Sequence, residues 1–189
     1  MADARERLLE ATYSCVARWG MAKTRVDDVA REAKMSRATV YRYFPGGRDE
    51  LFREVVRWEA ARFFEELTRA VAPRHDFAEL LEEALLFAHK ALEEHVVLQR
   101  ILVTEPDRFL PLLTVENARI LGLVKQFLVL AAHRATLRPG VSVDEATDYL
   151  SRMLLSYLGS PGQWNLDDRG EVRLLVRTEL LAGIAAPGE

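Results

Sequence analysis

The chain has 189 residues, 49% of them hydrophobic, and a net charge of −3, so it can form one compact domain or two small ones with a sizeable core. Ala, Leu, Glu and Arg dominate, which predicts an all-α fold, and the single cysteine excludes an intrachain disulfide. The N-terminus is too polar for a signal peptide and no apolar run is long enough to span a membrane, so we expect a cytoplasmic protein.

Charge is distributed unevenly along the chain. Residues 1–58 hold 12 Lys/Arg and 9 Asp/Glu, whereas the remaining residues hold 14 and 20. A basic N-terminal segment on an acidic remainder is typical of a nucleic-acid-binding head joined to a body that does not bind nucleic acid. The net charge of the whole chain would, by itself, argue against such a partner.

The first predicted helix spans residues 3–19. Leu8, Thr12, Cys15 and Trp19 recur at helical spacing, and Gly20 follows them as a C-cap. This apolar face is expected to cover the segment that comes next. Cys15 lies on the same face, where a lone cysteine usually fills space in the core, and a redox sensor is the alternative.

A second, short helix is predicted after Thr24. Val26, Val29 and Ala33 share one apolar face at helical spacing. Thr24, with Asp27 three residues later, has the pattern of a capping box and predicts the start of the helix.

A third helix is predicted from about residue 37 to residue 44. Lys34 and Met35 form the turn before it, and Ser36 is a good N-cap. Val40 and Phe44 lie four residues apart and point inward together. Pro-Gly-Gly at residues 45–47 then ends the helix.

Two short helices joined by such a turn form a helix-turn-helix, whose second helix can enter the major groove of DNA. The outward side chains of residues 36–43 suit this role. Arginine can bind phosphate or a guanine edge, threonine can contact a base, tyrosine can reach phosphate, and the helix N-terminus binds anions. We therefore predict DNA contacts by Ser36, Arg37, Thr39, Tyr41, Arg42 and Tyr43, and the predicted set also includes Thr24, Arg25 and Ala38.

The run VDDVAREAKMSRATVYRYF, followed by a Gly break and ELF, resembles the DNA-binding head of the tetracycline-repressor (TetR/AcrR) family of bacterial transcription regulators. The resemblance implies a DNA-binding domain at residues 1–46 and a helical ligand-binding and dimerisation domain at residues 47–189. Two features depart from the family pattern. Lys34 stands where the family usually has glycine, so a left-handed backbone would cost more there. The link Pro45-Gly46-Gly47-Arg48 is longer than the Phe-Pro-x-Lys link of the family, and Arg48 is included in the predicted DNA-contact set in place of the family's phosphate-contacting lysine.

The rest of the chain is predicted to be helical. A long helix at residues 48–71 leads out of the head, and Pro106 and Pro111 are expected to bracket an irregular segment. No flexible linker or internal repeat is present. Further helices are predicted at residues 76–95, 96–103, 112–135, 143–158 and 171–184.

The resemblance implies that the body binds a small molecule between its middle helices. Such pockets are mostly apolar with a few polar groups, although each candidate taken singly also fits ordinary core or surface. The aromatic candidates favour a small hydrophobic effector. Candidate wall residues are Trp58, Phe63, Phe87, Phe109 and Phe127, and candidate polar groups are His89, His95, Gln99 and Asn117.

The resemblance also implies a homodimer formed through the last two helices. A two-fold dimer would place two recognition helices on a near-palindromic site of double-stranded DNA. The alternative is that both helices pack only against their own chain. We expect a ligand-responsive regulator, a repressor released from its operator when the effector tilts the helix that begins at residue 48.

Two other functions compete with this one. An enzyme of the di-iron helical-bundle type needs Glu three residues before His, and none of the four histidines has it. No nucleophile elbow, phosphate-binding loop or zinc spacing is present, so no catalytic residue, metal ligand or cofactor is expected. A helical interaction protein that has lost DNA binding is the second rival, and the outward Arg and Tyr side chains argue against it.

Overall fold

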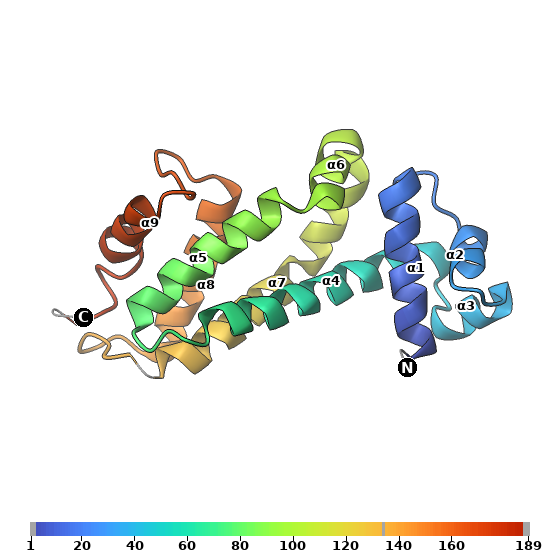
Figure 1. The fold of residues 1–189 in the computed structure, drawn as a ribbon. Helices are drawn as coiled ribbons and strands as arrows, with labels where there is room; N and C mark the ends of the chain where they lie inside the picture. The colour runs from blue at the N-terminus through green and yellow to red at the C-terminus, as the bar shows by residue number, and fades with distance from the viewer. Residues whose placement is uncertain (1–2, 134, 187–189) are drawn as a thin grey trace. The chain divides into compact units, whose positions relative to one another are not determined.

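The computed structural model describes residues 3–133 and 135–186, and for residues 109–117 it describes the backbone alone. Over these ranges the protein is helical and has no β-strand, which confirms the predicted all-α fold (Figure 1). The helices are α1 (Ala4–Trp19), α2 (Val26–Glu32), α3 (Arg37–Tyr43), α4 (Gly47–Val71), α5 (Phe77–Glu93), α6 (Val96–Thr104), α7 (Pro106–Ala132), α8 (Val143–Gly159) and α9 (Arg169–Leu175), followed by a π-helical segment, η1 (Val176–Leu180).

The chain forms two compact units. Unit 1 comprises residues 1–63 and 95–116, and unit 2 comprises residues 64–94 and 117–189. Both α4 and α7 contribute to each unit. The predicted functional division at residue 46 stays a prediction, because compactness does not define function.

Unit 1 contains the three-helix head, in which α2 and α3 pack beside α1 (Figure 1). Leu8 and Leu9 of α1, Val29 of α2, and Val40 of α3 are almost completely buried together. The apolar spacing seen in the sequence therefore marks the faces that form this core. The helix-turn-helix prediction is confirmed by this arrangement.

The start of α2 differs from the prediction. Thr24 is buried and its hydroxyl donates to the carbonyl of Gly20 (2.7 Å), so its side chain does not cap the helix. Arg25 is the N-cap residue instead, and its backbone N–H donates to the carboxylate of Asp28 (3.1 Å). The predicted capping box is wrong by one residue because the threonine hydroxyl has a closer partner in the preceding loop.

The segment after Pro106 also differs from the prediction. It is helical from Pro106 onward and belongs to α7, whereas an irregular stretch was expected. Pro106 is the first residue of the helix, a position where proline is favoured because its missing N–H would have no partner there.

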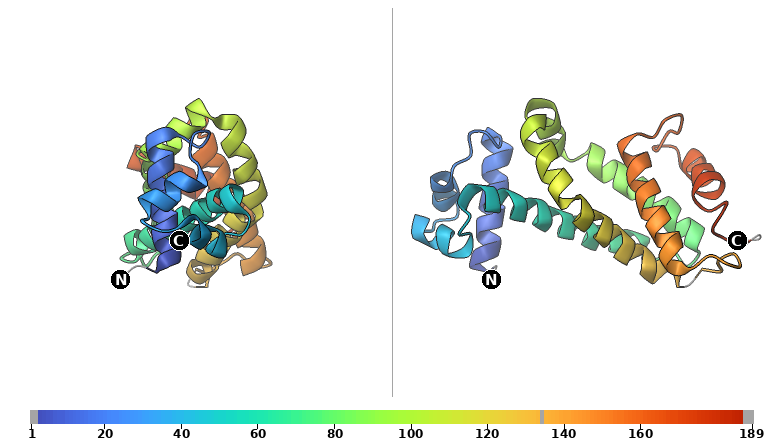
Figure 2. Two further views of the ribbon diagram at one scale, coloured as in Figure 1. Left: turned by 90° about the vertical axis from the view of Figure 1, so that its right-hand side faces the viewer. Right: turned by 180° about the vertical axis from the view of Figure 1, so that it is seen from behind.

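Unit 2 is built around α5, which packs against α8 and α9 (Figure 2). Leu81 and Leu85 of α5, Leu150 of α8 and Leu175 of α9 are almost completely buried in one cluster. The carboxylate of Glu82 on α5 is also buried, and it accepts a hydrogen bond from the Nε of Arg173 (3.2 Å).

The last predicted helix, residues 171–184, is shorter and less regular than expected. The Asp168 side chain caps α9, which therefore begins at Arg169, and η1 ends at Leu180. The last carbonyl groups of a helix have no partner within the helix. The hydroxyl of Tyr149 on α8 donates to one of them, the carbonyl of Glu179 (3.0 Å).

Lys34, in the turn between α2 and α3, has a φ of 55°. This left-handed conformation is strained for a residue with a Cβ atom. We expect Lys34→Gly to raise the free energy of unfolding by about 0.5–1 kcal/mol. Urea unfolding measures the change, with Lys23→Gly as the control, because Lys23 is exposed but lacks a positive φ. A loss of stability in Lys34→Gly equal to that in Lys23→Gly would show that the turn is not strained.

Candidate nucleic-acid interface

One face of α3 is fixed in the head and the opposite face lies in solvent. The Ser36 side chain accepts a hydrogen bond from the backbone N–H of Thr39 (3.0 Å), as predicted for an N-cap. Val40 and Phe44 are fully buried and anchor the helix on the head core. Because residues four apart share a helix face, Tyr41 and Arg42 between them point outward, whereas Tyr43 is half-buried and packs against the head core.

The exposed face of α3 carries two guanidinium groups. The Arg37 guanidinium lies 3.3 Å from the Asp27 carboxylate and 5.7 Å from the centre of the Tyr41 ring. A hydrogen bond to Tyr41 and the charge of Asp27 raise the pKa of Arg37. The Arg42 guanidinium lies 5.3 Å from the centre of the Tyr43 ring. Each guanidinium group thus lies at the surface and makes a cation–π contact with a neighbouring tyrosine ring.

The other surface candidates, which are Ser36, Ala38, Thr39, Tyr41 and Arg25, lie on or beside the same face. The Thr39 hydroxyl is partly exposed and lies 2.9 Å from the Ser36 hydroxyl. Ala38 is exposed, Tyr41 is 39% exposed, and Arg25 is exposed at the start of α2. The structure therefore brings Ser36, Arg37, Ala38, Thr39, Tyr41, Arg42 and Tyr43 together on α3 and its N-cap.

Two predicted contact residues point inward. Thr24 is 1% exposed. The Arg48 side chain donates from its Nε to the carbonyl of Thr24 (2.9 Å) and from a terminal nitrogen to the carbonyl of Met21, and it lies over the Phe52 ring. Both residues hold the loop between α1 and α2. Their predicted DNA contacts stay predictions, and we leave them out of the proposed interface.

The turn after α3 is shaped by glycine. Gly47 has a φ of 63°, and a Cβ atom there would lie 3.2 Å from the Tyr41 ring. The backbone N–H of Gly46 donates to the carboxylate of Glu50 (2.7 Å). The missing side chain at Gly47 thus leaves room for the Tyr41 ring, a role that the sequence pattern did not reveal.

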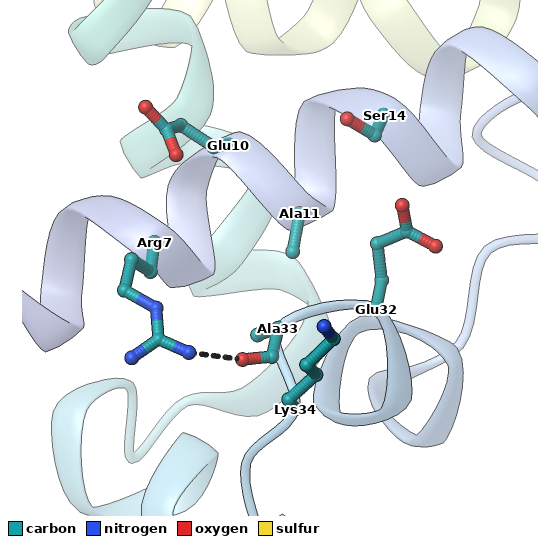
Figure 3. A pocket seen from close by; sticks show the side chains of 7 residues that line it. All are labelled: Arg7, Glu10, Ala11, Ser14, Glu32, Ala33 and Lys34. Atoms are coloured by element: carbon teal, nitrogen blue, oxygen red, sulfur yellow. Dashed lines mark hydrogen bonds between the residues drawn. The ribbon is translucent and has the colours of Figure 1, made fainter. Parts of the chain in front are cut away.

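A polar groove of about 290 Å³ lies between α1 and the end of α2 (Figure 3). The Arg7 guanidinium donates to the carbonyl of Ala33 (2.8 Å) and so caps the C-terminal end of α2. Charged groups dominate the lining, which does not suit a hydrophobic molecule. The lining residues are Arg7, Glu10, Ala11, Ser14, Glu32, Ala33 and Lys34.

The candidate effector residues are divided between the two units. Trp58, Phe63 and Gln99 belong to unit 1, whereas Phe87, His89 and Phe127 belong to unit 2. Three candidates remain. His95 belongs to unit 1, and the side chains of Phe109 and Asn117 lie outside the described residues.

Two candidates in unit 2, His89 and Phe127, contact other residues of the same unit. The Nε2 of His89 lies 3.5 Å from a carboxylate oxygen of Asp167, and Phe127 packs against the core of unit 2. These contacts fit ordinary packing as well as a pocket wall, so the predicted ligand roles stay predictions.

His95 connects three elements of unit 1. Its Nδ1 accepts the backbone N–H of Leu98 (3.0 Å), which caps α6, and its Nε2 lies 3.3 Å from the Glu59 carboxylate. The hydrogen bond to Glu59 raises the pKa of His95, and burial opposes it. The ring also meets the edge of Tyr13, whose ring in turn contacts Trp58. His95 and Trp58 therefore hold α1, α4 and α6 together.

Cys15 is fully buried in the head core. Burial, together with Glu32 and Asp28, raises the pKa of its thiol to about 11. Because the thiolate is the reactive form, this environment suits a residue that fills space and does not suit a redox sensor.

Two further kinds of feature are absent from the described residues. Among them, no three His, Cys, Asp or Glu side chains are placed to hold a metal ion. No helix within these ranges is long and apolar enough to cross a membrane.

Comparison with known proteins connects these features to a family. The family model for bacterial regulatory proteins of the tetR family matches residues 8–55. No curated protein matches the chain in sequence.

Solved structures of low sequence identity share the fold. The TetR-family repressor AlkX from Dietzia sp. strain DQ12-45-1b is 20% identical, over 92% of this chain and 94% of that chain, with a TM-score of 0.68. A TetR-family regulator from Mesorhizobium loti MAFF303099 is 18% identical, over 97% of each chain, with a TM-score of 0.64. SmeT, the repressor of the Stenotrophomonas maltophilia efflux pump SmeDEF, is 21% identical, over 100% of this chain and 93% of that chain, with a TM-score of 0.60.

Proposed function

We infer that this chain, a member of the tetR family of bacterial regulatory proteins, is a DNA-binding transcription regulator that responds to a small hydrophobic molecule. The exposed face of α3 carries the inference. Val40 and Phe44 fix one side of this helix in the core, while Arg37, Thr39 and Arg42 remain on the other side. An anchored helix with exposed arginines is suited to reading base edges in a major groove.

In the proposed interface, one set of residues would contact phosphate and another would contact base edges. The N-terminus of α3 at Ser36 and the hydroxyls of Tyr41 and Tyr43 would bind phosphate and set the position of the helix. Thr39 and Arg42 would contact base edges, since they lie on the side of α3 opposite the buried Val40 and Phe44.

We propose that two copies of the chain bind one near-palindromic operator. One recognition helix covers few base pairs, and a two-fold dimer places two of them about 34–36 Å apart, or a multiple of this distance. The last two helices would form the interface. Leu174 of α9 is 53% exposed and Tyr149 of α8 is 40% exposed, so both present apolar surface in the single chain.

Leu174→Arg is expected to convert the dimer into a monomer, because each interface would then bury two uncompensated charges. Sedimentation velocity measures the mass of the species. Leu130→Arg is the matched control, since Leu130 lies on α7 and is 71% exposed. A dimer that persists in Leu174→Arg, or is lost equally in Leu130→Arg, would contradict the proposed interface.

We propose a hydrophobic effector and a repressor function on the basis of similar proteins. AlkX is a repressor implicated in the biodegradation of n-alkanes, and SmeT has been solved in complex with triclosan. An effector would act on this chain only through a difference in its affinity for the DNA-binding and the released conformations. The similar proteins are regulators, so we propose that the chain does not catalyse a reaction.

Selection from a random library of duplex DNA tests the function. The purified protein is expected to enrich a near-palindromic sequence, and its affinity for that duplex should fall steeply as salt concentration rises. Failure to bind any duplex at low salt would contradict the proposal. It would favour the second candidate, a helical interaction protein that has lost DNA binding.

A further inference from the structure

The junction between α6 and α7 is part of the same compact unit as the head. Residues 95–116 cluster with residues 1–63, and two polar contacts join them directly. The Arg100 guanidinium donates to the carbonyl of Ala17 near the end of α1 (2.9 Å), and the Glu105 carboxylate accepts the backbone N–H of Ala22 (2.6 Å).

An apolar cluster lies beside these two contacts. Val16 and Met21 from the end of α1 and the following loop are buried against Phe52 of α4 and Ile101 of α6. Because tightly packed side chains resist small displacements, the cluster keeps the junction close to the loop.

The Glu105 carboxylate fills space that a side chain at position 20 would occupy. Gly20 has a φ of 83°, and a Cβ atom built on it would lie 2.2 Å from an oxygen of Glu105. The same loop receives hydrogen bonds from the Thr24 hydroxyl and the Arg48 guanidinium. Four side chains therefore bind the backbone of residues 20–25, namely those of Thr24, Asp28, Arg48 and Glu105. Of these four, Glu105 alone comes from outside the head and α4.

Glu105 is the single residue between the end of α6 and the start of α7. Its backbone N–H donates to the carbonyl of Ile101 in α6 (2.8 Å), and its carbonyl accepts the N–H of Arg108 in α7 (3.1 Å). A change in the angle between α6 and α7 must therefore move the Glu105 backbone and the carboxylate attached to it.

We propose that Glu105 is a positioning residue that transmits the arrangement of the α6–α7 junction to the loop at residues 20–25. This loop leads directly into the N-cap of α2, so its backbone sets where α2 and the attached α3 lie in the head. Loss of the Glu105 contact frees the loop and weakens the hold on α2 and α3. The consequence for operator binding rests on the proposed function, whereas the consequence for the loop does not.

Three variants of the full-length protein test this role. Glu105→Ala removes the acceptor, and Glu105→Gln keeps an oxygen that can accept from Ala22. Asp107→Ala removes a negative charge two residues away, from an exposed side chain. Amide hydrogen exchange of residues 20–43 is measured in each variant, with peptides of α5 as an internal reference for folding.

Glu105→Ala is expected to speed exchange at residues 20–43 about tenfold, as the loss of a hydrogen bond to a charged acceptor predicts. Exchange in Glu105→Gln should remain close to wild type, and Asp107→Ala should match wild type. Unchanged exchange in Glu105→Ala, equal acceleration in Glu105→Gln, or equal acceleration in Asp107→Ala would overturn the proposal.

Affinity for the duplex selected by the wild-type protein is measured in parallel. Glu105→Ala should bind it about tenfold more weakly, with affinity recovered in Glu105→Gln. If the wild-type protein selects no duplex, the proposed function fails, and the exchange measurements still decide the role of Glu105.

Discussion

Replacing Thr39 and Arg42 together with alanine is expected to reduce the preference for the selected operator over random duplex by at least about a hundredfold. Each good contact to a base edge contributes about 1–3 kcal/mol of discrimination, and a dimer makes each contact twice. The effect on folding should be small, because both side chains lie at the surface and neither belongs to the head core. Competition binding with the two duplexes gives the ratio.

The matched control changes the same two residue types outside the head. Thr68→Ala with Arg69→Ala alters exposed positions on α4 and should leave the preference unchanged. Sedimentation should show an intact dimer in both double variants. If the Thr39 and Arg42 variant still distinguished the operator from random duplex, the assignment of α3 as the recognition helix would be wrong.

Phe44→Ala is expected to lower the free energy of unfolding by about 3–5 kcal/mol, since it removes a large buried side chain and leaves a cavity. Phe44 ends α3, has no exposed surface, and has the Arg5 guanidinium 5.5 Å from its ring centre. Operator binding should be lost as well, because α3 depends on this anchor. Urea unfolding followed by circular dichroism measures the change.

Trp19→Ala is the control for this experiment. Trp19 is an aromatic residue of the same unit but is 37% exposed, so its replacement should cost less than about 1 kcal/mol. Equal losses in the two variants would show that Phe44 is not an anchor of the head.

The helix-turn-helix was predictable because its information is local. The apolar spacing of Val26, Val29 and Val40 marks the buried faces, and Ser36 caps α3 through its own third neighbour. Such signals need only residues that are close in sequence. The exposed face of α3 followed directly from them.

The predictions that were wrong or incomplete concern side chains whose hydrogen-bond partners are distant in sequence, or which have a second possible partner nearby. Thr24 has the composition of a cap, yet its hydroxyl binds Gly20, and Arg48 turns inward to two loop carbonyls. The end of the last helix depends on η1, which no periodicity predicts. Glu105 could not have been found from sequence, because its partner, Ala22, is 83 residues away.

The predicted effector site has the weakest basis in the sequence. Aromatic residues such as Trp58 and Phe127 can line a pocket or fill a core, and sequence spacing does not distinguish the two roles. In the structure each packs within its own unit, against the head core and against the core of unit 2. The hydrophobic class of the effector, which composition suggested, therefore stays a prediction, as does its site.

Amide hydrogen exchange with and without the selected duplex tests the central claim most directly. At low salt, the duplex should slow exchange at residues 36–43 more than at residues 64–94 or 135–186, because only α3 and its surroundings would contact DNA. Protection confined to unit 2, with exchange at residues 36–43 unchanged by bound duplex, would contradict the account.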